Sequence, residues 1–245
     1  MEAANPFSEI KTYDSYSQPV RLFVFSSLVS LAFSLAAMFV LNKVLKSGTG
    51  DAEITSFVQG AVYTLACLKV LKDQGVDFRA AWRDWLAKAG SDAVSALKYY
   101  FFYLLITGAM IALVMGVIRL TAIPDADIVR GLGARNELYA AARTALDVSW
   151  FRFSFMLFSF CVLAPIGEEL LFRRIIYTTL RKKMSFPRAL SVSSVIFAAT
   201  HGAAALLVFP VSLLLGYTYE KKRRLPVNIM LHALVNLFVL AVRLT

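Results

Sequence analysis

The sequence predicts an all-α protein, a polytopic transmembrane helix bundle of about seven spans, with six to eight compatible with the pattern. Hydrophobic residues make up 58% of the 245 residues and the mean hydropathy is +0.64, whereas a soluble domain is about 45–50% apolar. The stretch 22–41 holds twenty residues without a charge, and about 20 residues of helix cross the ~30 Å hydrocarbon core. Runs of this length favour the bilayer over a large soluble core.

Seven apolar runs define the expected spans. Residues 1–20 are polar, and the first run is too long for the apolar part of a cleaved signal peptide, so we expect it to be retained. The fifth run is short, which favours a helix buried among the others. The expected spans are 22–41, 54–71, 98–118, 151–172, 189–201, 204–219 and 226–244.

The segment 76–89, between the second and third spans, has an amphipathic pattern. Phe78, Trp82 and Trp85 recur at helical spacing, and charged residues occupy the other faces. Tryptophan is typical of the boundary between hydrocarbon and water. The pattern predicts either an interfacial helix or a helix packed on the bundle.

The net charge of +10 predicts an orientation rather than a nucleic-acid partner. The basic residues gather between apolar runs, as in cytoplasmic loops that face anionic lipid headgroups. With the N-terminus in the cytoplasm, seventeen of the 26 basic residues lie inside, eight lie outside, and Lys69 lies within a span. We therefore expect a multi-pass protein of a bacterial-type cell membrane with a cytoplasmic N-terminus.

Two adjacent carboxylates follow the fourth apolar run. Glu169 and Arg173 stand four residues apart, so on a helix they face each other, whereas Glu168 points about 100° away. Ionisable groups in a span cost about 2.5–3.5 kcal/mol or more each and often mark a functional site. The spacing pairs Glu169 with Arg173 and leaves Glu168 free to act as a general base, unless both acids reach water at the membrane edge.

Both histidines of the chain also lie in apolar segments. His201 ends the fifth run, and His232 and Asn236 share one face of the last span. Such groups need partners across the bundle, because lipid offers none, and hydrogen bonding between helices would also explain them. Together with the acid pair they provide a base, imidazoles and an amide donor, which is what hydrolysis by water requires.

Three ordered motifs resemble those of the CPBP family, which includes CAAX prenyl-protein endopeptidases, bacteriocin-processing enzymes and abortive-infection-like membrane proteases. The motifs are Glu168-Glu169-x-x-x-Arg173, Phe197-x-x-x-His201 and His232-x-x-x-Asn236. The resemblance covers about 165–240. It implies a helical intramembrane endopeptidase with a cavity opening near the cytoplasmic side.

By matching positions, the resemblance implies that Glu168 activates water with His201 as its partner, and that His232 and Asn236 bind the oxyanion. Glu169, Arg173 and Phe197 would support them. The substrate would be a membrane-associated or lipidated protein or peptide, cleaved near its C-terminus or close to the membrane.

The resemblance favours a mechanism without a cofactor. A zinc ion held by Glu168, His201 and His232 is the alternative, although the sequence has no His-Glu-x-x-His helix. Two non-protease classes also stay open: a scaffold or immunity protein of the same fold, and a transporter with a proton relay. A transporter would be expected to show repeated halves, and the sequence shows none.

The expected organisation is one integrated membrane domain. Residues 1–150 would supply N-terminal transmembrane helices and the interfacial helix near 76–89, and residues 151–245 the catalytic helix core. The connection 119–150 is the longest outside the spans, and 136–147 within it could form a surface helix.

Overall fold

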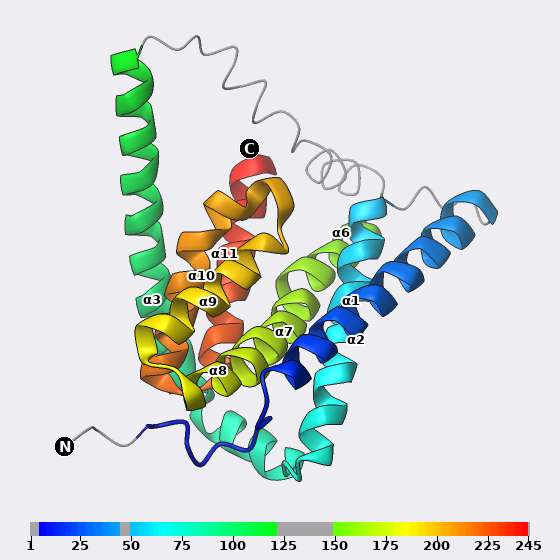
Figure 1. The fold of residues 1–245 in the computed structure, drawn as a ribbon. Coiled ribbons are helices and arrows are strands. Elements are labelled where there is room, and N and C mark those ends of the chain that lie inside the picture. The colour runs from blue at the N-terminus through cyan, green and yellow to red at the C-terminus, as the bar shows by residue number, and fades with distance from the viewer. Residues whose placement is uncertain (1–4, 45–49, 122–148, 245) are drawn as a thin grey trace.

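The computed structural model describes residues 5–44, 50–121 and 149–244, and these residues form helices without a β-strand (Figure 1). The expected surface helix over 136–147 lies outside the described residues. In chain order the elements are α1 (Ser17–Met38), η1 (Phe39–Val44), α2 (Asp51–Asp73), α3 (Phe78–Thr121), α6 (Trp150–Phe158), η2 (Ser159–Leu163), α7 (Ala164–Glu169), η3 (Leu170–Tyr177), α8 (Thr178–Lys183), α9 (Phe186–Ala199), η4 (Gly202–Ala204), α10 (Ala205–Lys222) and α11 (Leu225–Leu244).

Five helical segments in the described part of the chain are long and apolar enough to cross a membrane. The remaining two expected spans correspond to α9, which has 14 residues, and to α10, whose 18 residues end in three charged ones. The all-α, multi-pass class predicted from the sequence is confirmed. The five segments are Ser17–Val44, Asp51–Asp73, Phe78–Val117, Trp150–Lys183 and Leu225–Val242.

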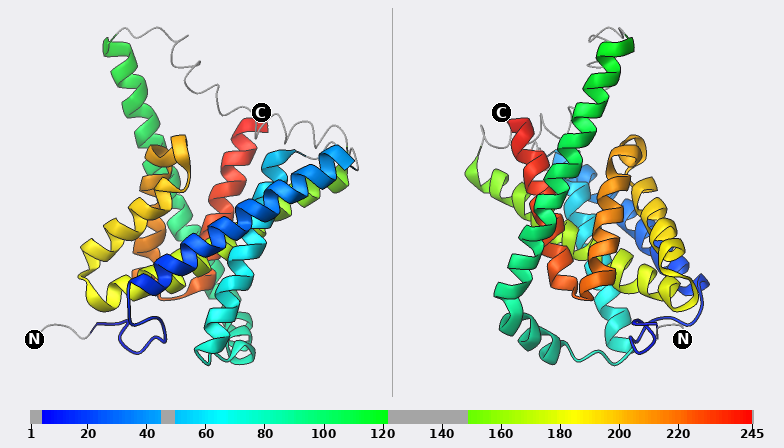
Figure 2. Two further views of the ribbon diagram at one scale, coloured as in Figure 1. Left: turned by 45° about the vertical axis from the view of Figure 1, so that its right-hand side comes forward. Right: turned by 90° about the vertical axis from the view of Figure 1, so that its left-hand side faces the viewer.

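The expected interfacial helix over 76–89 is not a separate element. Its residues from Phe78 onward form the first turns of α3, which continues through the expected span 98–118 for 44 residues in all. Residues 90–97 contain no proline, and Gly90 alone does not stop a helix. In Figure 2 the beginning of α3 lies across the lower end of the molecule, and the rest of the helix rises from it.

The chain from α6 to α8 crosses α2 at two glycines. A side chain on Gly60 would place its Cβ 2.9 Å from the backbone nitrogen of Ala164, and a Cβ on Gly167 would lie 2.7 Å from the Gly60 carbonyl oxygen. The two backbones therefore touch, as in membrane helix pairs with small residues at the interface. This crossing fixes the position of Glu168, the residue after Gly167.

One end of the bundle gathers the N-terminal segment, the α2–α3 turn, the α8–α9 turn and the α10–α11 turn (lower end in Figure 1). The Asn5 amide donates to the Arg181 carbonyl at 2.7 Å, and Arg174 donates to the Lys11 carbonyl at 2.8 Å. The predicted orientation requires these basic segments to share one side, and they do. Which side faces the cytoplasm stays a prediction.

An ion cluster at the same end ties the start of α3 to the turn before α11. Arg224 binds both carboxylate oxygens of Asp92 at 2.6 Å, and its third contact is Asp84 at 2.7 Å. The hydrogen bonds from Asp92 and Asp84 raise the pKa of the Arg224 guanidinium. The cluster anchors α11, which carries three polar residues of the candidate site.

Candidate active site

The two glutamates lie on α7, a short α-helical segment between the π-helical segments η2 and η3. A π-turn inserts an extra residue into the helical ladder and is often found at functional sites. Pro165 near the start of α7 lacks an N–H group, so it interrupts the backbone hydrogen bonds at this point.

Glu169 is fully buried, and both of its carboxylate oxygens have polar partners. Its Oε2 lies 3.4 Å from Arg173 Nε and accepts a hydrogen bond from Asn228 Nδ2 at 3.1 Å. Its Oε1 lies 3.0 Å from His232 Nδ1. The pairing with Arg173 is the one that the i,i+4 spacing predicts, and it fixes Glu169 in place.

Arg173, also fully buried, joins η3 to two further helices. Its guanidinium donates to Ser193 Oγ on α9 at 3.2 Å and to Ser212 Oγ on α10 at 3.1 Å. It also lies over the Phe197 ring, 5.1 Å from the centroid. Arg173 therefore positions α9, the helix that leads to His201, as well as neutralising Glu169.

Glu168 has a different environment, because 12% of its side chain is exposed. Its Oε2 lies 3.6 Å from His232 Nε2. His232 thus stands between the two carboxylates. An ionised Glu169 can only accept, so Nδ1 of His232 carries a proton and Nε2 faces Glu168.

The Phe197 ring contacts both His201 and His232. The Phe197 ring centroid lies 4.8 Å from that of His201 and 5.8 Å from that of His232. His201 Nδ1 lies 2.9 Å from the Phe197 carbonyl oxygen, which leaves Nε2 for another partner. Within the described ranges, no hydrogen bond or ion pair joins His201 to Glu168.

Asn236 contacts the backbone of η2, which belongs to the helical stretch that also carries the two glutamates. Its Nδ2 donates to the Phe160 carbonyl oxygen on η2 at 2.8 Å. The structure therefore joins Glu168 with His232 directly, and brings His201 and Asn236 to the edges of the same centre. The catalytic roles expected for these four residues stay predictions.

The sequence pattern missed Asn228, Ser193 and Ser212. Asn228 is fully buried and stands four residues before His232, on the same face of α11. That spacing was a usable signal, since the stripe of His232 and Asn236 extends back by one turn. The two serines gave no comparable signal, because serine also bonds within its own helix.

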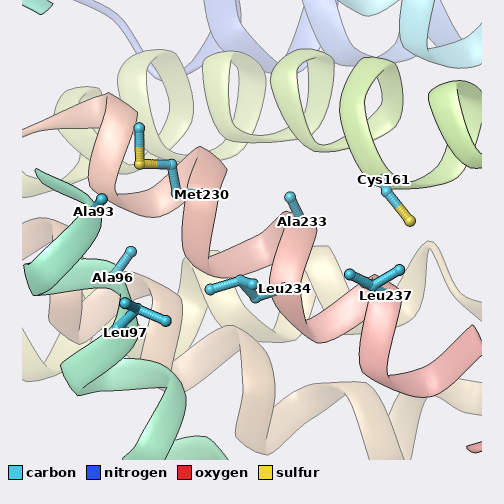
Figure 3. Close-up of a pocket in the computed structure, with 8 residues that line it drawn as sticks. All are labelled: Ala93, Ala96, Leu97, Cys161, Met230, Ala233, Leu234 and Leu237. Atoms are coloured by element: carbon cyan, nitrogen blue, oxygen red, sulfur yellow. The ribbon is translucent and has the colours of Figure 1, made fainter. Parts of the chain in front are cut away.

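An apolar groove of about 390 Å³ lies between α3, η2 and α11 (Figure 3). Its lining carries no charged side chain. Met230 and Ala233 on α11 border it, on either side of His232 in the sequence. The lining residues are Ala93, Ala96, Leu97, Cys161, Met230, Ala233, Leu234 and Leu237.

A metal site would need several ligands around one point. Over residues 5–44, 50–121 and 149–244, no group of three His, Cys, Asp or Glu residues is arranged to hold a metal ion. Glu168 and His232 are close to each other, and among the described residues no hydrogen bond or ion pair joins His201 to either of them.

These features define a class: a helical membrane protein with a carboxylate–imidazole–carboxylate centre among its helices. Residues 150–238 match the family described as Type II CAAX prenyl endopeptidase Rce1-like. The match falls on the stretch that carries the three motifs, and it agrees with the resemblance to the CPBP family drawn from them.

A curated relative is similar over part of its length. It is named "Putative membrane peptidase YdiL" and comes from Bacillus subtilis (strain 168). The two sequences are 34% identical over 85 residues, which is 34% of this chain and 35% of the relative. The chain thus spans about a third of the length of that relative in the match. No solved structure gives a significant match.

Proposed function

We propose that this chain is an intramembrane endopeptidase that hydrolyses a peptide bond of a membrane-associated or lipidated protein, with Glu168 as the base that activates water. The observation that carries the proposal is the difference between the adjacent glutamates. Glu169 is buried and fully bonded, whereas Glu168 keeps some exposure and faces His232 Nε2.

Glu168 is suited to take a proton from water. One of its oxygens faces His232, and its partial exposure lets a water molecule reach the carboxylate. A general base must lie within hydrogen-bond reach of the proton that it removes, and proton transfer of this kind contributes about 10²–10⁴-fold to a rate.

His232 would assist at the same point. Its Nδ1–H is held by Glu169, so the ring is oriented and Nε2 points toward the reacting carboxylate. When Glu168 gains a proton from water, Nε2 can accept it and later return it to the leaving amine. The charge of Glu169 is balanced by Arg173, which keeps the arrangement stable through both steps.

His201 is the candidate for a further donor toward the substrate. Its Nδ1 is bonded to the Phe197 carbonyl, so its position is fixed while Nε2 is left for another partner. The apolar groove along α11 would accept a lipid chain or an apolar part of the substrate, which favours a lipidated one.

The experiment uses the purified full chain in proteoliposomes with an internally quenched peptide ending in a prenylated CAAX sequence. We expect cleavage by the wild type in the presence of a strong zinc chelator, and a loss of about 10²-fold or more in Glu168→Gln, which keeps the shape and removes the base.

The other outcomes replace the proposal. Loss of activity in chelator that zinc restores would make Glu168, His201 and His232 metal ligands. If neither the wild type nor Glu168→Gln cleaves the prenylated peptide, its unprenylated counterpart or any membrane protein compared by proteomics of expressing cells, a scaffold replaces the enzyme.

A further inference from the structure

The Phe160 carbonyl lies where the helical hydrogen-bond ladder is broken. In an α-helix its donor would be the Ala164 N–H, but that group donates to the Ser159 carbonyl, five residues back. In the wider π-turn its donor would be residue 165, and Pro165 has no N–H. Neither register of the backbone therefore supplies the Phe160 oxygen with a partner.

Asn236 supplies the missing donor from another helix. Its Nδ2 lies 2.8 Å from the Phe160 oxygen. Pro165 is buried, so this part of the helix is shielded from water. Without Asn236 the Phe160 carbonyl would lack a donor, which is costly in lipid because no water can replace the lost bond. One side-chain amide on α11 thus completes the backbone of η2.

The bond joins the two continuous helical stretches that carry the proposed reacting groups. Phe160 precedes Glu168 by eight residues and His232 precedes Asn236 by four, so the bond lies about two turns from Glu168 and one turn from His232. The sequence neighbours of the bonded residues, Cys161 and Leu237, face each other across the groove (Figure 3).

We propose that Asn236 is a positioning residue: its amide replaces the hydrogen bond that Pro165 removes, and this bond holds His232 in register with Glu168. The proposal rests on the endopeptidase function for its effect on rate, but the bond itself does not. It differs from the oxyanion role that the family resemblance implies, since the partner of the amide is a backbone carbonyl of the enzyme.

The two roles of Asn236 predict different behaviour when Pro165 is replaced. Pro165→Ala restores a backbone N–H, and the Phe160 oxygen regains a donor in either helical register. Bonded within its own helix, that oxygen no longer links η2 to α11, so a positioning amide has little left to contribute in this background. An oxyanion donor stays necessary, because a donor on η2 cannot replace an amide aimed at the substrate.

The experiment is a double-mutant cycle on the full chain in detergent, with the wild type, Asn236→Ala, Pro165→Ala and the double variant. Two quantities are measured. One is the midpoint of thermal unfolding, and the other is kcat on the quenched prenylated CAAX peptide at a temperature well below the lowest of the four midpoints.

In the wild-type background, Asn236→Ala should lower the midpoint by about 3–6 °C and kcat by about tenfold or more. In the Pro165→Ala background the same change should shift the midpoint by less than about 2 °C and kcat by less than about threefold.

Each other outcome overturns the proposal in a distinct way. Equal losses of kcat in both backgrounds would make Asn236 an oxyanion donor. A shifted midpoint with unchanged kcat would leave it a purely structural residue. If the changes in unfolding midpoint caused by the two substitutions are additive, the effects of Pro165 and Asn236 do not meet at the Phe160 oxygen.

The cycle also separates this inference from the proposed function. If no variant cleaves the peptide, the endopeptidase proposal fails, while the midpoints still test the shared bond. If Asn236→Ala does not fold, recovery of folded protein in the double variant supports the bond, and failure of both variants contradicts it.

Discussion

The helix chain from Trp150 to Lys183 and the helix α3 are both long and apolar, yet they differ in what surrounds them. In the most apolar window of the first, 50% of the residues are buried, whereas in that of α3 the share is 6%. The upper part of α3 stands clear of the other helices (Figures 1 and 2). Large apolar side chains occur on both, so in a bilayer they do not mark the interior.

Polar and small residues mark the interior of the bundle instead. The buried segment carries Gly167 at a backbone contact and the fully buried Glu169 and Arg173, while α3 presents Leu105 and Leu113 outward. Lipid tails are as apolar as leucine, so close packing and interhelical hydrogen bonds, not apolar burial, distinguish the inside of a membrane bundle.

The largest expected effect comes from breaking the polar interior at Arg173. Arg173→Met keeps the volume and leaves Glu169 buried without its cation, so the free energy of unfolding should fall by about 3–5 kcal/mol. Thermal unfolding of the purified protein in detergent measures the change.

The adjacent Arg174 is the matched control for that prediction. Its guanidinium donates to the Lys11 carbonyl at an exposed site, so Arg174→Met should lower stability by less than about 1 kcal/mol. Similar losses in the two variants would show that the Glu169–Arg173 pair does not stabilise the interior.

A smaller effect is expected at the helix crossing. Gly167→Ala would place a Cβ 2.7 Å from the Gly60 carbonyl, so the helices must separate, at about 1–3 kcal/mol of stability, and Glu168 must shift with them. We expect a lower unfolding midpoint together with slower peptide cleavage.

The smallest effect is expected for the same substitution on α3. A Cβ at Gly108 meets no atom within 4 Å, and alanine favours a helix over glycine, so Gly108→Ala should leave stability equal or raised by up to about 1 kcal/mol. A loss at Gly108 as large as that at Gly167 would remove the distinction between the two helices.

Much of the fold could be predicted from the sequence, because long uncharged runs have few structural solutions in a membrane. The boundaries were less predictable. The pattern separated 76–89 from 98–118 by polarity, but nothing between them ends a helix, and one helix covers both. The burial of Phe7 in the N-terminal segment was also not predicted, since its neighbours are polar.

In the candidate site, the sequence predicted contacts within one helix but not contacts between helices. The i,i+4 rule gave the Glu169–Arg173 pair and singled out Glu168. Which histidine faces Glu168 depends on how α9 and α11 pack, and the structure places His232 there. The Asn236–Phe160 bond depends on a π-turn, which the sequence shows only as Pro165.

The central claim is that adjacent glutamates divide two tasks, Glu168 reacting and Glu169 holding the centre together. Cleavage of the quenched prenylated CAAX peptide and the unfolding midpoint of Glu168→Gln and Glu169→Gln, measured side by side, test it most directly. We predict that Glu168→Gln loses about 10²-fold or more in rate with a nearly unchanged midpoint, and that Glu169→Gln lowers the midpoint and loses less rate. A Glu168→Gln variant that retains its rate, or a well-folded Glu169→Gln variant that loses as much, would contradict the account.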